Sequence, residues 1–128
     1  MTEPVAEEKN LAIVLNRELM FGSRIRGALG VLGLEGRFVP DTESFLAAIR
    51  TDGGSAAIGI LDMNGPIGWE DLSEALSEMA DTPPTLAFGP HVDVENRRAA
   101  KAAGVTRIVS NGQFHSDVAT LIDRYRRR

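Results

Sequence analysis

Five short apolar segments, spread along the whole chain, limit the possible fold more than any other feature. Residues 11–15 and 56–61 have the composition of buried strands, and residues 36–40 that of a short outer strand. Each of the five precedes a longer segment with the pattern of a helix. These five strand segments are 11–15, 36–40, 56–61, 85–88 and 106–109. Strands that alternate with helices in this way form right-handed β-α-β units and a parallel sheet. The sequence therefore predicts an α/β fold.

The intervening segments carry the start and stop signals of helices. Gly33 and Gly104 follow the first and fourth of them, and Asp41 supplies a capping side chain before the second. Ser116 and Asp117 are predicted to cap the last. The five predicted helices cover 19–32, 41–52, 70–80, 94–103 and 116–125. Five β-α units fit a doubly wound, five-stranded parallel sheet of order 2-1-3-4-5, with helices on both faces.

Size and composition predict one domain. The chain has 128 residues, of which 43% are hydrophobic and 25% charged, so it holds enough apolar material for a single core. We expect the domain to span residues 11–128, after a flexible N-terminal arm at residues 1–10 that shows no periodicity. The closing Arg126-Arg127-Arg128 is predicted to be a solvated helix end, where cations suit the helix dipole.

Charge and composition also exclude several classes of function. The net charge of -4 argues against a nucleic-acid partner, because such binding rests on a basic face. The absence of cysteine excludes disulfides and thiolate chemistry, and two histidines are too few for a multi-histidine metal site. No apolar run is long enough to span a bilayer, and the polar N-terminus does not resemble a signal peptide. We therefore expect a cytoplasmic protein with no membrane partner.

Polar side chains follow several predicted strands, at the edge where open parallel sheets hold their ligands. They are Asn16 and Arg17 after the first strand, Asp62 after the third, Gly89 after the fourth and Asn111 after the fifth. Two stretches, Ile60-Leu61-Asp62-Met63-Asn64-Gly65-Pro66 and Arg97-Arg98-Ala99-Ala100-Lys101-Ala102-Ala103-Gly104, resemble the receiver domains of bacterial response regulators, which have the CheY-like, flavodoxin-like fold. The resemblance covers about residues 10–125.

The resemblance implies a phosphorylation site at Asp62, but the residues that would support it depart from the family pattern. Receivers bind Mg²⁺ with an acidic pair after the first strand, which Asn16 and Arg17 replace here. Gly89 stands where receivers carry a Thr or Ser, and Asn111 where they carry a Lys. The sequence therefore resembles an atypical, degenerate receiver, or pseudo-receiver, with no metal and no cofactor. Mg²⁺ remains an alternative if Glu18, one position late, binds it together with Asp62.

Three residues at this edge have two interpretations each. Asp62 is either the phosphoacceptor or a structural side chain, which caps its own loop or pairs with Arg17. His91, after the fourth strand, is either a proton-sensitive group at the site edge or an ordinary loop histidine. Trp69, the single tryptophan, either anchors an interface or packs on the loop proline Pro66.

The sequence predicts a signalling and protein-interaction module of two-component type that works without aspartyl phosphorylation and is not an enzyme. Its expected partner is another signalling protein or a second copy of itself, which it would contact through the side formed by the fourth strand to the last helix. Arg97 and Arg98 there suit an acidic partner. The alternative function is a phosphorelay receiver that is phosphorylated at Asp62. A small-ligand flavodoxin-like domain is less favoured, because Asn16–Gly22 is not a hydroxyl-rich phosphate loop.

Overall fold

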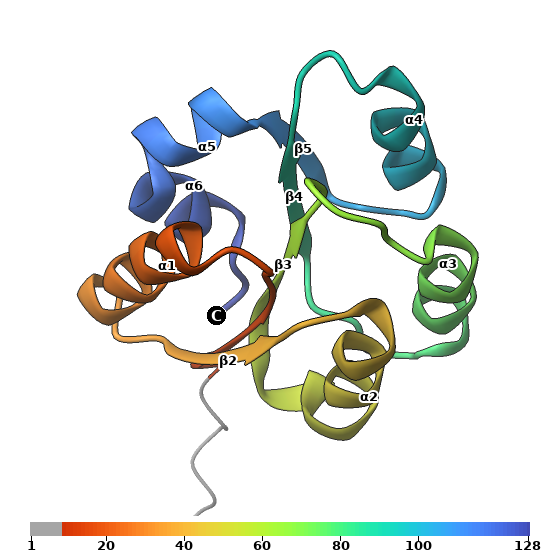
Figure 1. The fold of residues 1–128 in the computed structure, drawn as a ribbon. Coiled ribbons are helices and arrows are strands. Elements are labelled where there is room, and N and C mark those ends of the chain that lie inside the picture. The colour runs from red at the N-terminus through yellow and green to blue at the C-terminus, as the bar shows by residue number, and fades with distance from the viewer. Residues whose placement is uncertain (1–8) are drawn as a thin grey trace, which may run out of the picture.

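A five-stranded parallel sheet runs through the middle of the computed structural model, which describes residues 9–128 (Figure 1). The first eight residues of the predicted N-terminal arm lie outside the described range. The strands are β1 (Leu11–Leu15), β2 (Glu35–Val39), β3 (Ala56–Asp62), β4 (Thr85–Gly89) and β5 (Arg107–Ser110). Their order is β2-β1-β3-β4-β5, and all neighbours are parallel. The predicted sheet and strand order are confirmed.

Helices cover both faces of this sheet, as predicted. They are α1 (Leu19–Val31), α2 (Thr42–Asp52), α3 (Trp69–Glu78), α4 (Val94–Ala102), α5 (Asn111–Ser116) and α6 (Val118–Tyr125), with the short 3-10 turn η1 (Gly53–Ser55) after α2. In Figure 1, α1, α5 and α6 lie on one side of the sheet and α2, α3 and α4 on the other. Across the described range, none of the helices combines the length and the apolar character that crossing a membrane requires.

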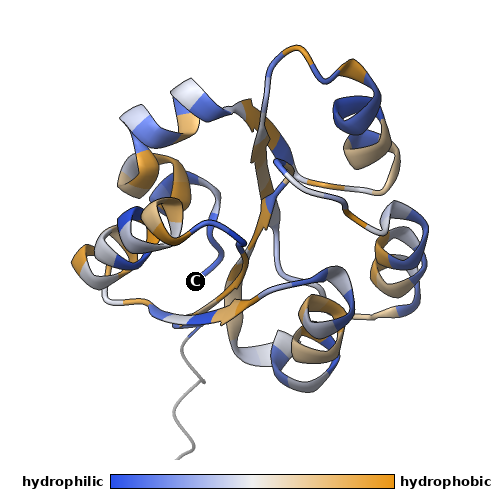
Figure 2. Cartoon of the chain, in the orientation of Figure 1, coloured by the Kyte–Doolittle hydropathy of each residue, from blue (hydrophilic) through white to orange (hydrophobic). Residues whose placement is uncertain are grey.

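The core consists of two apolar clusters, one on each face of the sheet. Ile13, Phe45 and Leu72 belong to the cluster under α2, α3 and α4, whereas Ile25 and Phe88 belong to the cluster under α1, α5 and α6. All residues of β1, β3 and β4 are buried, which explains why these strands are continuous apolar runs in the sequence. The apolar sides of the helices turn toward the sheet (Figure 2).

Two glycines end helices at the predicted places. Gly33 follows α1 with a φ of 71°, and Gly104 follows α4 with a φ of 96°. Both angles lie in the left-handed region, which glycine adopts without the clash of a Cβ atom.

The segment between β5 and the last helix differs from the prediction. Residues 111–116 form α5, a helix that the sequence analysis did not predict, and Phe114 from this helix is fully buried. Ser116 therefore ends α5 instead of capping α6. Asp117 does occupy the N-cap position of α6, but its side chain makes no capping hydrogen bond.

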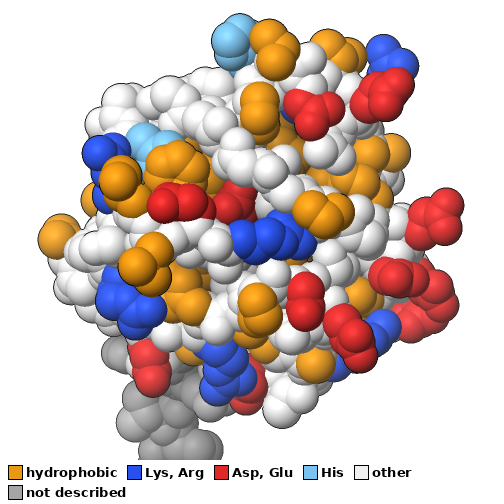
Figure 3. Space-filling view, in the orientation of Figure 1, with side chains coloured by type: hydrophobic (Ala, Val, Ile, Leu, Met, Phe, Trp, Pro, Cys, Tyr) orange, Lys and Arg blue, Asp and Glu red, His pale blue; other side chains and the backbone are white. Residues whose placement is uncertain are grey.

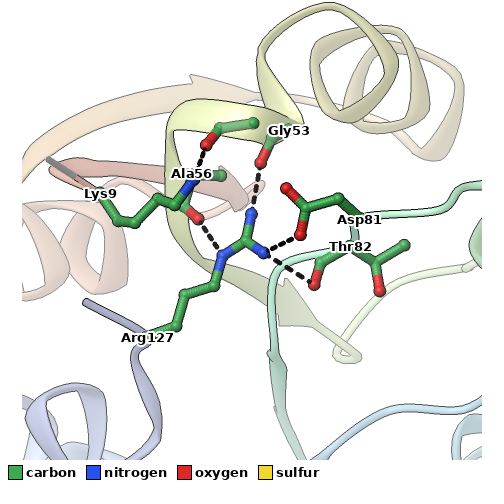
Figure 4. A network of polar contacts seen from close by, with 7 residues as sticks. Lys9, Gly53, Ala56, Asp81, Thr82 and Arg127 are labelled. Carbon is green, nitrogen blue, oxygen red and sulfur yellow. Dashed lines mark hydrogen bonds and ion pairs between the residues drawn. The ribbon is translucent and has the colours of Figure 1, made fainter. Parts of the chain in front are cut away.

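Arg127 is not solvated as predicted but joins three parts of the chain (Figure 4). Its Nε donates to the Ala56 carbonyl at 2.9 Å and its Nη2 to the Gly53 carbonyl at 2.6 Å. Its Nη1 pairs with the Asp81 carboxylate and donates to the Thr82 carbonyl at 3.3 Å. The guanidinium therefore holds the C-terminal segment against the start of β3 and the loop before β4.

Candidate functional site

Asp62 is the last residue of β3, a central strand, and its side chain is buried, with a relative exposure of 1%. Its Oδ1 atom accepts two hydrogen bonds from Asn64, one from the backbone N–H at 2.8 Å and one from the side-chain Nδ2 at 2.8 Å. The carboxylate thus caps its own loop, which is one of the two interpretations given to it from the sequence.

Asn64 also joins the β3 loop to the end of β5. Its Nδ2 donates to Asn111 Oδ1 at 2.9 Å, and Asn111 Nδ2 donates to Asn64 Oδ1 at 2.8 Å. Asn111 is the first residue of α5 and stands where the receiver resemblance places a lysine. The two amides are neutral and satisfy each other, so this part of the site carries no cationic group.

Arg17 extends across the loop between β3 and α3. Its Nη1 donates to the backbone carbonyl of Asp62 at 3.4 Å, and its Nη2 donates to the carbonyl of Pro66. The guanidinium lies so close to Gly65 that a Cβ atom on this glycine would be 2.8 Å from Nη1. Within residues 9–128, no ion pair joins the Arg17 guanidinium to the Asp62 carboxylate. The predicted pairing of the two side chains is therefore wrong.

Glu18, the proposed second metal ligand, is the N-cap of α1. One carboxylate oxygen accepts from the Met20 N–H at 3.0 Å and the other from the Phe21 N–H at 2.8 Å. These two bonds lower the pKa of Glu18, because they stabilise its charged form. The neighbouring Asn16 donates through Nδ2 to the Glu18 carbonyl at 2.8 Å. Both oxygens of Glu18 are therefore engaged in holding the start of the helix.

Gly89 ends β4 against the side chain of Met63. A Cβ atom on Gly89 would lie 2.9 Å from Met63 Cβ and 3.3 Å from Met63 Cε. Met63 is itself buried, with an exposure of 2%, and follows Asp62 directly. The position that carries a hydroxyl in the receiver pattern thus has no room for a side chain here.

The two remaining sequence candidates, His91 and Trp69, lie near the start of α4 and at the start of α3. His91 is exposed in the loop between β4 and α4. Trp69 opens α3, is half-buried, and donates from Nε1 to Asn96 Oδ1 of α4 at 2.8 Å. Within residues 9–128, neither His91 nor Trp69 forms a hydrogen bond or an ion pair with Asp62.

His115, which the sequence analysis did not select, lies beside the site in α5. Its ring stacks on Phe21 with centroids 4.1 Å apart, and it meets Phe88 and Phe114 edge-on at 5.5 Å and 5.1 Å. Both ring nitrogens are buried and have no hydrogen-bond partner in the described part of the chain. This contact was not predicted, because it depends on α5, a helix that the strand and helix pattern did not reveal.

The pKa of His115 is lowered, and the main cause is burial, which disfavours the charged ring. The positive charge of Arg24 lowers it further. Asp62 and Glu18 act in the opposite direction, which places His115 in the field of both carboxylates of the site. Acidic and basic side chains lie next to one another near the middle of the face drawn in Figure 3, among apolar side chains.

No protein-family model matches the chain, and no curated protein matches it. Solved structures do match. A response-regulator receiver domain from Bermanella marisrubri superposes with a TM-score of 0.74 at 16% identity, over 92% of this chain and 98% of the other. The phosphorylated cyanobacterial phytochrome response regulator RcpA gives a TM-score of 0.74 at 17% identity, over 91% and 93%.

The chemotaxis protein CheY4 of Vibrio cholerae is also similar, with a TM-score of 0.71 at 18% identity, over 90% of this chain and 97% of the other. These similarities extend over nearly the whole chain, and the strand order and flanking helices agree with them. The chain therefore has the fold of CheY-like receiver domains.

Proposed function

We propose that this protein is a signalling module of receiver type that works through its surfaces and without phosphorylation of Asp62. The receiver fold supports a signalling role, since such domains are generally non-enzymatic modules that bind other proteins. The position of Arg17 supports the second part of the proposal. The Arg17 guanidinium lies across the loop that follows Asp62. This is the edge where a receiver needs a bound Mg²⁺ ion for phosphorylation.

The side chains at this edge do not fit a magnesium ion. Mg²⁺ prefers an octahedral set of oxygen ligands with at least one or two free carboxylates. Here Glu18 uses both oxygens to cap α1, and Asp62 Oδ1 already accepts two bonds. The positive charge of Arg17 also repels a cation. We propose that the protein binds neither Mg²⁺ nor another cofactor here.

Acetyl phosphate labelling tests the proposal. The purified protein is incubated with Mg²⁺ and acetyl phosphate, and its intact mass is measured, with Asp62→Asn treated in parallel. We expect no added phosphoryl group in either protein. A phosphoryl mass that appears in the wild type and is missing from Asp62→Asn would overturn the proposal in favour of a phosphorelay receiver.

Two substitutions of Arg17 test whether its positive charge prevents Mg²⁺ from binding. Arg17→Asp removes the guanidinium and restores a carboxylate after β1, whereas Arg17→Gln removes the guanidinium alone. Mg²⁺ titration is followed by the fluorescence of Trp69, the single tryptophan, which opens α3 just after the loop that Arg17 crosses. We expect a saturable change for Arg17→Asp and none for the wild type or Arg17→Gln. Saturable binding by the wild type would contradict the proposed role of Arg17.

A further inference from the structure

A shallow groove of about 460 Å³ lies between α3 and α4. Small side chains line most of it, namely Ser73, Ala99, Ala102 and Ala103. Trp69 lines it too, and its hydrogen bond to Asn96 ties the two helices together. Small side chains allow another helix to approach the backbone closely, and a half-buried tryptophan is a frequent anchor at interfaces.

The helices on either side of this groove carry opposite charges. Helix α3 has four acidic residues and no basic one, and acidic side chains gather over it in Figure 3. Helix α4 has three basic residues, Arg97, Arg98 and Lys101, and one acidic residue, Glu95. None of these side chains takes part in an ion pair within residues 9–128. Their charges are therefore available to an outside partner.

Apolar side chains are exposed at the start of α4. Val92 has a relative exposure of 74% and Val94 of 58%. Val94, Arg98 and Lys101 recur at intervals of four and three residues, so they lie along one side of the helix. This side of α4 thus combines an apolar start with a basic end.

We propose that a second copy of this chain docks on the α3–α4 surface, with α4 of each copy against α3 of its partner. In a two-fold dimer each contact occurs twice, so a surface with one acidic and one basic helix complements itself. The proposal rests on the interaction role proposed above and assigns a surface and a partner to it. This surface shares α4 with the side expected from the sequence, but it extends to α3 instead of to β5 and the last helix.

In an antiparallel arrangement, the charges of the two helices match across the dimer. Glu70 then faces the partner's Lys101, and Glu74 faces the partner's Arg98. The acidic pair is four residues apart and the basic pair three, or about 6 and 4.5 Å along a helix axis, so both contacts form together. Exposed ion pairs add little affinity but select orientation, while the apolar groups supply most of the attraction.

Sedimentation of two charge-reversed variants tests the dimer. One variant carries Glu70→Lys and Glu74→Lys, and the other Arg98→Glu and Lys101→Glu. In each variant the facing side chains at both proposed contacts carry the same sign, so we expect the dimer dissociation constant to rise about tenfold or more. When the two variants are mixed, opposite signs meet at both contacts, and we expect a heterodimer to form. Added salt should weaken the wild-type dimer.

Arg24→Glu with Arg124→Glu is the matched control, because it reverses two exposed charges on α1 and α6, on the opposite face of the sheet. We expect this variant to dimerise like the wild type. A wild-type chain that stays monomeric up to its solubility limit overturns the proposal, as does a mixture that forms no heterodimer. No phosphoryl donor is present in the sedimentation experiment. A failure to dimerise is therefore distinguishable from phosphorylation of Asp62, which would overturn the proposed function.

Discussion

At the carboxyl ends of the strands, several side chains of the candidate site bond to near neighbours. Asp62 accepts from Asn64, which in turn pairs with Asn111, and Arg17 donates to two backbone carbonyls. Strand positions in the sequence were enough to predict which of these residues share an edge. They were not enough to predict that Arg17 would contact carbonyl oxygens instead of the Asp62 carboxylate, because that depends on rotamers and loop shape.

The stacked histidine provides a pH test at this scale. Burial lowers the pKa of His115 below 6.5, so the unfolded chain takes up a proton first as the pH falls. The stability that the neutral ring contributes is complete above pH 6.5 and is lost as the pH falls through the lowered pKa. We expect His115→Phe, which keeps the stack on Phe21, to flatten the dependence of the urea midpoint between about pH 5 and pH 7.5.

His91 is the matched control, since it is the only other histidine and is exposed. His91→Gln should leave the pH dependence as it is in the wild type. Equal slopes in His115→Phe and the wild type would show that His115 is not the titrating group.

Gly89 provides a packing test. Gly89→Ala places a methyl group 2.9 Å from Met63 Cβ, so we expect a loss of about 1–3 kcal/mol in the free energy of unfolding, and a larger loss for Gly89→Thr. The Met63→Gly background removes the opposing Cβ, and the loss caused by Gly89→Ala should nearly disappear in it. Urea unfolding followed by circular dichroism measures the wild type, the three single variants and the double variant. Additive losses would contradict the direct contact.

At the scale of elements, the apolar periodicity and the helix start and stop residues of the sequence predict the five strands and most helices. They do not predict α5. It has six residues, too few to show a helical repeat, and contains Gly112. One signal was present, because Ser110 and Gln113 have the spacing of a capping box, and the Ser110 hydroxyl accepts from the Gln113 N–H at 3.1 Å. The contact of His115 with Phe21 could not be predicted without this helix.

The N-cap of α2 tests how much a helix end contributes. Asp41 accepts from the Ser44 N–H at 2.8 Å, and this bond lowers the pKa of Asp41 below 3.8. Its contribution to stability is present above pH 3.8 and is lost as the pH falls through the lowered pKa. We expect Asp41→Ala to lower the urea midpoint at pH 7. At a pH low enough to protonate Asp41 in both the folded and the unfolded state, the variant should differ little from the wild type.

Glu43→Gln removes the same charge two positions later, in the first turn of α2, and makes no change to the capping bond. It should reduce the midpoint less than Asp41→Ala does at pH 7. An equal effect of both substitutions would assign the contribution to charge at the helix start instead of to the hydrogen bond.

In the molecule as a whole, the candidate site and the C-terminal segment lie at opposite ends of the sheet. The carboxyl ends of the strands carry the candidate site, while the opposite end is closed by the C-terminal segment, where the Arg127 backbone N–H also donates to the Ala57 carbonyl at 2.9 Å. Local patterns predicted the fold because each strand and helix carries its own periodicity. They did not predict this closure, because the partners of Arg127 lie 45–74 residues away along the chain.

Removing the Arg127 side chain should therefore destabilise the whole domain. Arg127→Ala removes the guanidinium donors from the carbonyls of Gly53 and Ala56 and the cation from the Asp81 carboxylate, and we expect a loss of about 2–3 kcal/mol. The side chain of Arg128 is 68% exposed against 22% for Arg127, so Arg128→Ala should change stability by less than about 0.5 kcal/mol. Urea unfolding at pH 7 measures both, and equal losses would mean that the C-terminal arginines act only through net charge.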